Sequence, residues 1–141
     1  MDFSEKDIST TVMSIVIVDD NVTNLVVLKH LAGGLSYQPA CTFSKSEIAR
    51  AYLSPNNAML IVVDCNMPDL SGIDFTPIVR GFLHHRHTPI AMVTSHSEDK
   101  IRMKALQSGI TDFLSKPVNP VEFRRHLRHL LELTAFEAEL Q

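Results

Sequence analysis

Short apolar runs alternate along the chain with stretches of helical periodicity. The runs lie at 15–18, 59–63 and 90–93, with a weaker one at 111–114. Runs that are apolar at every position are typical of strands buried on both faces of a parallel sheet. A further short strand is expected around 39–42. Pro39 places it at an edge of the sheet, because proline cannot donate to a hydrogen-bond ladder.

The segments between these runs begin with side chains that favour helix starts. A capping side chain stands three residues before a carboxylate in four pairs: Ser44 and Glu47, Ser71 and Asp74, Ser95 and Glu98, Asn119 and Glu122. Helices are therefore predicted over about 22–33, 45–54, 73–84, 97–108 and from 120 onward. Pro77 conflicts with the third helix, which is expected to start late or to kink. Five alternations of strand and helix predict an α/β fold with a doubly wound sheet.

Composition narrows the class of protein. A chain of 141 residues fits one domain, and 45% hydrophobic with 21% charged residues excludes a wholly disordered chain. The net charge of −3 gives no electrostatic reason to expect nucleic acid or a membrane as a direct partner. No signal peptide and no apolar run near the ~20 residues of a membrane span are visible, so a cytoplasmic location is expected. Cys41 and Cys65 are expected to be buried free thiols.

Polar side chains follow four of the predicted strands. Asp19 and Asp20 follow the first, Asp64 the 59–63 run, Thr94 the 90–93 run and Lys116 the last. Parallel strands bring their carboxyl ends to one edge of the sheet. Carboxylates crowded there repel one another unless a cation such as Mg²⁺ lies between them. A carboxylate can also attack phosphorus, with a lysine and a hydroxyl holding the phosphoryl oxygens. Each residue alone has an ordinary structural interpretation, but the four positions together favour a site.

Four segments match a known family in order and spacing. They are Val-Asp-Asp-Asn at 18–21, Asp-Cys-Asn-Met-Pro-Asp-Leu-Ser-Gly at 64–72, Thr-Ser at 94–95 and Ser-Lys-Pro-Val at 115–118. From about 14 to 131 the chain resembles the receiver domain of two-component response regulators. The resemblance implies a five-stranded parallel sheet of order 2-1-3-4-5, the flavodoxin/CheY-like (βα)5 fold. The expected organisation is an N-terminal extension (1–13), the receiver (14–132) and an extension of the last helix (133–141).

The resemblance also implies a role for each residue of the site. Asp64 is the expected phosphoacceptor, and Lys116, before a cis peptide to Pro117, binds the phosphoryl group. Mg²⁺ is expected on Asp19, Asp20, Asp64 and the backbone carbonyl of Asn66. Thr94 is the expected switch hydroxyl.

Two further positions relate to switching and to phosphoryl lifetime. Phe113 stands at the aromatic switch position, where many relatives have tyrosine. It can pack inward but has no hydroxyl to offer a partner. Asn66 and His96 are the candidates for tuning dephosphorylation, although a solvated histidine explains His96 equally well.

The implied function is a phosphorylation switch. A sensor histidine kinase or phosphotransfer protein donates the phosphoryl group, and the face of the fourth helix, fifth strand and fifth helix changes what it binds. The chain is then not an enzyme beyond its own phosphorylation and dephosphorylation. An alternative is a haloacid-dehalogenase-like phosphatase, but its Asp-x-Asp pattern is missing at the first strand. A nucleotide-binding module lacks its glycine-rich loop here, and the intact acidic set argues against a receiver that is never phosphorylated.

The last helix carries two apolar stripes. Phe123, Leu127 and Leu131 should face the sheet, whereas a second stripe comprises Leu130, Leu133, Phe136 and Leu140. The second stripe favours a homodimer or a linker to an output domain. The segment after Lys116 and Pro117 resembles that of receivers that precede cyclic-di-GMP phosphodiesterase or related enzymatic output domains. A frayed tail and a stand-alone regulator stay open as alternatives.

Two other features favour structural interpretations. His84, His85 and His87 are expected in a solvated loop rather than in a metal site. Cys65 should point away from Asp64 and be inert.

Overall fold

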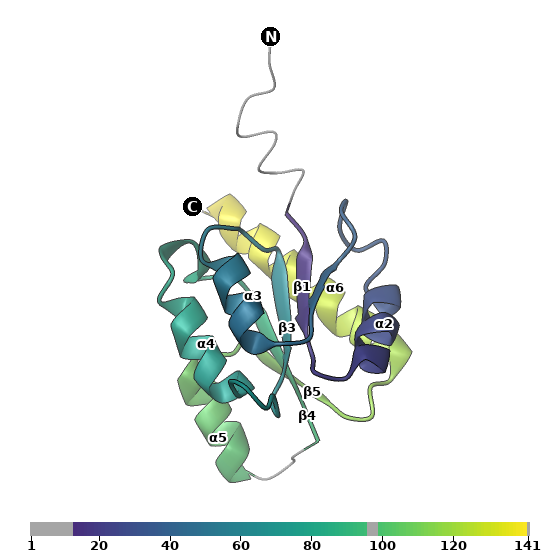
Figure 1. Cartoon of the computed structure of the whole chain (residues 1–141). Helices are drawn as coiled ribbons and strands as arrows, with labels where there is room; N and C mark the ends of the chain where they lie inside the picture. Colours follow the sequence, from purple (N-terminus) through teal and green to yellow (C-terminus); the bar gives the residue numbers. More distant parts are fainter. Residues whose placement is uncertain (1–12, 96–98, 141) are drawn as a thin grey trace.

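The computed structural model describes the backbone of residues 13–95 and 99–140, and the side chains of these residues up to 134. Its centre is a parallel sheet of five strands: β1 (Ile15–Val18), β2 (Cys41–Phe43), β3 (Leu60–Asp64), β4 (Ile90–Thr94) and β5 (Asp112–Ser115). The strands follow the order β2-β1-β3-β4-β5 (Figure 1). The predicted fold class and strand order are confirmed. The edge strand β2 begins at Cys41, so Pro39 precedes it instead of lying within it.

Helices cover both faces of the sheet. On one face lie α2 (Val22–Leu31) and α6 (Pro120–Leu140). The other face carries α3 (Ser46–Leu53), α4 (Gly72–Arg80) and α5 (Asp99–Ser108), as Figure 1 shows. Along β1, Ile15 and Ile17 pack toward α2 and α6, whereas Val16 and Val18 pack toward the other helices. Because neither face of the central strand β1 meets water, this strand is apolar at every position.

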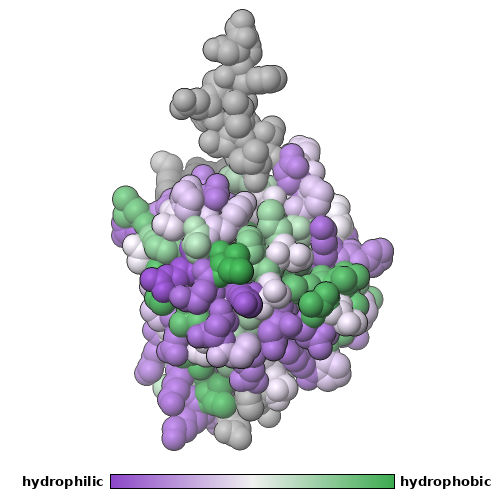
Figure 2. Space-filling model, viewed as in Figure 1, coloured by the Kyte–Doolittle hydropathy of each residue, from purple (hydrophilic) through white to green (hydrophobic). Residues whose placement is uncertain are grey.

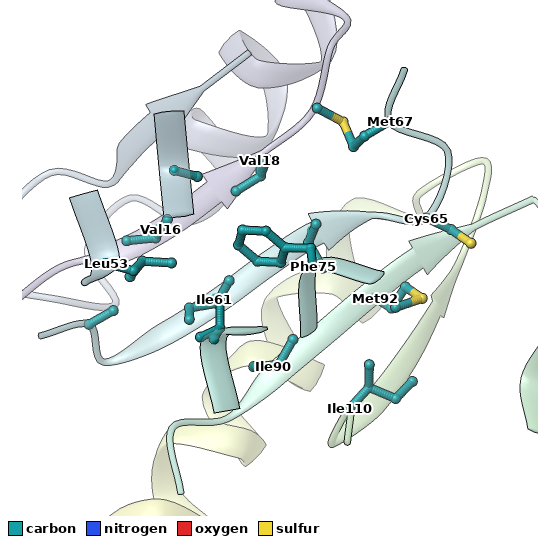
Figure 3. Packing of buried hydrophobic residues seen from close by; sticks show 14 of the residues in the cluster. Val16, Val18, Leu53, Ile61, Cys65, Met67, Phe75, Ile90, Met92 and Ile110 are labelled. Atoms are coloured by element: carbon teal, nitrogen blue, oxygen red, sulfur yellow. The ribbon is translucent and has the colours of Figure 1, made fainter. Parts of the chain in front are cut away.

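Phe75 of α4 anchors the core on the α3–α5 face. Its side chain is wholly buried, among residues of β1, β3 and β4 that include Val16, Ile61 and Ile90 (Figure 3). Removing a side chain of this type from water contributes roughly 1.5–3 kcal/mol. Cys65 belongs to the same cluster, so it packs away from the α2 and α6 face.

The buried stripe of α6 differs from the predicted one. Phe123, Leu127 and Leu130 are buried, whereas Leu131 is only half-buried but, as predicted, still packs against the same cluster. Leu130 therefore belongs to the stripe that faces the sheet, because a spacing of i, i+4, i+7 keeps side chains on one side of a helix. Of the second stripe, Leu133 is 43% exposed. The side chains of Phe136 and Leu140 lie outside the described residues.

Helix ends agree with the sequence where the capping contact is local. Ser71 Oγ accepts the Asp74 N–H at 3.1 Å, and Asn119 Oδ1 accepts the Glu122 N–H at 3.0 Å. The cap predicted at Ser44 is wrong: the N-cap of α3 is Lys45, whose side chain makes no capping bond. The cap at Ser95 depends on Glu98, which lies outside the described residues.

The third predicted helix is shorter than expected. Helix α4 begins at Gly72 rather than late, contains Pro77 and ends at Arg80, with Gly81 as its C-cap. A separate 3-10 turn, η1 (Leu83–His85), follows it. Glycine lowers helix propensity by about 1 kcal/mol relative to alanine, which favours an end at this point.

The solvated loop predicted for the histidine cluster is wrong at His85, which is fully buried. Its Nε2 lies 3.0 Å from the carbonyl oxygen of Leu53 and 2.9 Å from that of Asn56, and its Nδ1 lies 3.0 Å from Thr88 Oγ1. The last carbonyls of a helix lack partners within the helix, and the imidazole satisfies one of them at the end of α3. Burial lowers the pKa of His85, which favours the neutral ring.

The two cysteines differ in burial. Cys65 is buried as predicted, but Cys41 is only half-buried; both thiols are free. Burial raises the pKa of Cys65, although a hydrogen bond from Thr94 opposes this effect.

Most of the face in Figure 2 is hydrophilic, with separate hydrophobic patches. Within the described parts of the chain, no helix combines the length and the apolar character needed to cross a bilayer.

Candidate functional site

The carboxyl edge of the sheet gathers residues from the ends of four strands. Asp19 and Asp20 follow β1, Asp64 ends β3, Thr94 ends β4 and Lys116 follows β5. The ligand oxygens of the three aspartates all lie within 4.8 Å of one another. Lys116 Nζ donates to Asp64 Oδ2 at 2.8 Å. The parallel register brings these residues to the same level, so the convergence expected from the sequence is present in the structure.

Backbone and amide donors orient the two buried carboxylates. Asp19 Oδ1 accepts the Asn21 N–H at 2.8 Å, and its Oδ2 accepts the Asn24 side-chain amide at 3.4 Å. Asp64 Oδ1 accepts the Asn66 N–H at 3.1 Å. Asp20, by contrast, is exposed. The site therefore has two fixed carboxylates inside and one at the water boundary.

The electrostatics of this cluster favour a cation. Burial and the nearby charge of Asp64 raise the pKa of Asp19, against the lowering effect of the Asn21 N–H. Burial lowers the pKa of Lys116, but its hydrogen bond to Asp64 and the charges of the three aspartates outweigh burial and raise it. Lys116 therefore stays protonated and neutralises one of the negative charges. The remaining oxygen-only donor set, open to water at Asp20, fits the preference of Mg²⁺ for carboxylates and retained waters.

The two residues expected to act in switching lie near this cluster. Thr94 is buried, and its side chain hydrogen-bonds to the thiol of Cys65. Phe113 is half-buried on β5, with the guanidinium carbon of Arg102 5.3 Å from its ring centroid. A cation over an aromatic face is attracted by the ring quadrupole. His96, a candidate for tuning dephosphorylation, lies outside the described residues.

Three residues of the site region had no role assigned to them from the sequence. Asn24 supports Asp19 from the first turn of α2, a position that the spacing after Asp19 could have suggested. At Gly72 an added Cβ would lie 2.8 Å from the carbonyl oxygen of Asp64, so a close backbone approach requires glycine. Asp69 binds the start of α3, more than twenty residues away, and no local pattern signals such a contact.

Comparison with known proteins gives the family. The model of the response regulator receiver domain matches residues 15–128. The chain belongs to this family. Receiver domains of this family act in two-component signalling, interact with histidine kinases and phosphotransfer proteins, and typically bind Mg²⁺ at the acidic cluster.

This receiver spans different fractions of two curated relatives. It is 31% identical over 122 residues to the cyclic di-GMP phosphodiesterase response regulator RpfG of Xanthomonas campestris pv. campestris, covering 86% of this chain and 32% of that protein. The chain thus spans about a third of RpfG. It is 28% identical to the chemotaxis protein CheY of Pseudomonas aeruginosa over 120 residues, covering 85% of this chain and 97% of that protein.

A solved structure also resembles this receiver. It is the receiver domain of a sensor histidine kinase from Pseudomonas aeruginosa, with a magnesium ion coordinated in its active site cleft. The two are 27% identical with a TM-score of 0.77, and the match covers 85% of this chain and 98% of that one.

Proposed function

We propose that this receiver accepts a phosphoryl group on Asp64 from a sensor histidine kinase or a phosphotransfer protein. The observation that carries the proposal is the 2.8 Å contact between Lys116 Nζ and Asp64 Oδ2 within the group of three aspartates. This contact places a protonated amine on the nucleophilic carboxylate, where it can neutralise charge on an incoming phosphoryl group. Phosphoryl transfer is catalysed chiefly by such positioning and charge neutralisation.

The reaction forms an acyl phosphate. An oxygen of the Asp64 carboxylate bonds to phosphorus while the bond from phosphorus to the donor's histidine nitrogen breaks, and the imidazole leaves with the electron pair. Asp19, Asp20, Asp64 and the backbone carbonyl of Asn66 would hold Mg²⁺, which supplies charge neutralisation at the phosphoryl oxygens. The protonated Lys116 binds the same oxygens from the side of β5.

Phosphorylation makes the local charge at Asp64 about −1.5 to −2, and we propose that Thr94 and Phe113 respond to it. Thr94 turns its hydroxyl toward the phosphoryl oxygens, and Phe113 moves into the space that this frees. The half-buried ring supports the idea, because part of its surface is still exposed and would be buried by an inward movement. The face formed by α5, β5 and α6 then changes what it binds, while Asn66 and His96 tune the lifetime of the acyl phosphate.

The receiver is proposed to occupy residues 14–132 and to belong to a longer regulator. The similarity to RpfG supports an output domain of the cyclic-di-GMP phosphodiesterase class, with 133–141 as the start of the connecting helix. The exposed Leu133 supports a homodimer contact along α6. Sequencing the native reading frame past residue 141 tests the output domain directly.

Intact mass spectrometry tests the phosphoacceptor. The protein is incubated with acetyl phosphate and Mg²⁺, alongside Asp64→Asn. Wild type should gain the mass of one phosphoryl group, and the variant should gain none. An adduct on the variant, or no adduct on wild type, refutes the assignment. Multiple turnover of a phosphoester would support the phosphatase alternative instead.

A further inference from the structure

The loop between β3 and α4 carries a carboxylate that reaches a different helix. Asp69 lies five residues after Asp64, and its Oδ2 accepts the Glu47 N–H at 2.9 Å. Its Oδ1 accepts the Ser46 N–H at 3.3 Å. Ser46 and Glu47 are the first two residues of α3, so Asp69 binds the N-terminus of that helix.

Helix α3 depends on this distant residue for a cap. The first N–H groups of a helix have no partners within it, and the N-terminus favours negative charge. At Lys45 the backbone is extended, with φ −134° and ψ 131°, but the side chain makes no capping bond. Burial raises the pKa of Asp69, yet hydrogen bonds from the Glu47 and Ser46 N–H groups, with those of Asp69 and Leu70, outweigh it and lower the pKa. The cap is therefore an ionised carboxylate at neutral pH.

The same loop carries part of the proposed Mg²⁺ site. Asn66, whose backbone carbonyl is an expected ligand, lies three residues before Asp69, and its N–H donates to Asp64 Oδ1. At the far end, the Gly72 N–H donates to the Cys65 carbonyl at 2.9 Å. Asp69 adds a contact between the middle of this loop and helix α3. The loop that carries Asn66 is therefore joined to the N-terminus of α3 through Asp69.

We propose that Asp69 is a positioning residue for the phosphoryl site. By capping α3 it holds loop 65–71 so that the Asn66 carbonyl stays in place beside Asp64. The proposal rests on the proposed function, because it concerns Mg²⁺ and phosphoryl uptake at Asp64. Losing an outer support of a metal site typically weakens affinity by about 10–100-fold, and we expect about tenfold here because Asp69 acts through the backbone.

The experiment must separate holding the loop from stabilising α3. Asp69→Ala removes both effects. Lys45→Ser gives α3 a local cap, since a serine at an extended N-cap position accepts a helix N–H. The double variant, Lys45→Ser with Asp69→Ala, therefore has a capped α3 but lacks the contact between Asp69 and α3. Its net charge equals that of wild type. Lys45→Ser alone is the matched control. Asp69→Asn, which keeps one acceptor oxygen, replaces Asp69→Ala if that variant fails to fold.

Two quantities are measured on each variant: the Mg²⁺ dissociation constant by calorimetry, and the rate of phosphorylation by acetyl phosphate as a function of Mg²⁺. In Asp69→Ala the dissociation constant and the Mg²⁺ needed for half-maximal rate should both rise about tenfold, with the rate at saturating Mg²⁺ unchanged. In the double variant the thermal stability should recover while Mg²⁺ binding stays weak. Lys45→Ser alone should bind Mg²⁺ as wild type does.

The outcomes separate this proposal from the proposed function. If Mg²⁺ affinity recovers with stability in the double variant, Asp69 only caps α3 and the positioning role is refuted. Wild-type affinity in Asp69→Ala refutes it as well. A wild type that neither binds Mg²⁺ nor takes up a phosphoryl group refutes the proposed function, and this proposal with it.

Discussion

Replacing Asp19 with asparagine should stabilise the metal-free protein at pH 7. Asp19 is only 2% exposed, and its ligand oxygen lies within 4.8 Å of that of Asp64. Two like charges at that distance repel by about 3.5 kcal/mol at an effective dielectric constant of 20, and by about 0.9 kcal/mol in bulk water. Attraction to Lys116 offsets part of this repulsion, which leaves an expected net gain of about 1 kcal/mol in the free energy of unfolding.

Thermal denaturation in EDTA and in Mg²⁺ measures the effect. In EDTA, Asp19→Asn should raise Tm by roughly 2–6 °C for a domain of this size. Mg²⁺ should stabilise wild type more than the variant, because a ligand that binds the folded state more tightly stabilises it more. Asp20→Asn is the matched control: Asp20 is exposed, so its gain in EDTA should be smaller. An Asp19→Asn protein no more stable than wild type in EDTA refutes the claim that repulsion between the carboxylates destabilises the metal-free protein.

Three further predictions follow from single contacts. Gly72→Ala should destabilise the fold by about 1–3 kcal/mol in urea denaturation and slow phosphorylation, because its Cβ would meet the carbonyl oxygen of Asp64; unchanged kinetics would contradict this. Lys116→Met should slow phosphorylation about 100-fold while leaving calorimetric Mg²⁺ affinity at least as strong, since a cation leaves the acidic cluster; parallel loss of both would count against it. His85 has a pKa below 6.5 because of burial, with the positive charges of His84 and Arg80 adding to the effect. As pH falls through 6.5, the unfolded chain therefore binds the proton before the folded protein does. Between pH 7.5 and 5.5, the free energy of unfolding of wild type should fall more steeply than that of His85→Gln in urea denaturation. Equal slopes of this free energy against pH would refute the prediction.

Strands and local caps could be predicted from the sequence because their signals lie within a few residues. The runs at 15–18, 59–63 and 90–93 match β1, β3 and β4 to within one residue at each end. Ser71 and Asn119 cap helices by contacts three residues along the chain. The burial of His85 could not be predicted, because its partners Leu53 and Asn56 lie about thirty residues away.

The sequence by itself determined which side chains stand at the ends of the strands, and a parallel sheet then required them to share one edge. It also determined the family, through motifs that extend over most of the chain. The packing of separate elements decided the rest: that Lys116 touches Asp64, and that Asp69 rather than Ser44 caps α3. The physical reason is that local hydrogen bonds depend on spacing along the chain. A contact across the fold depends on where whole helices and loops settle against the sheet.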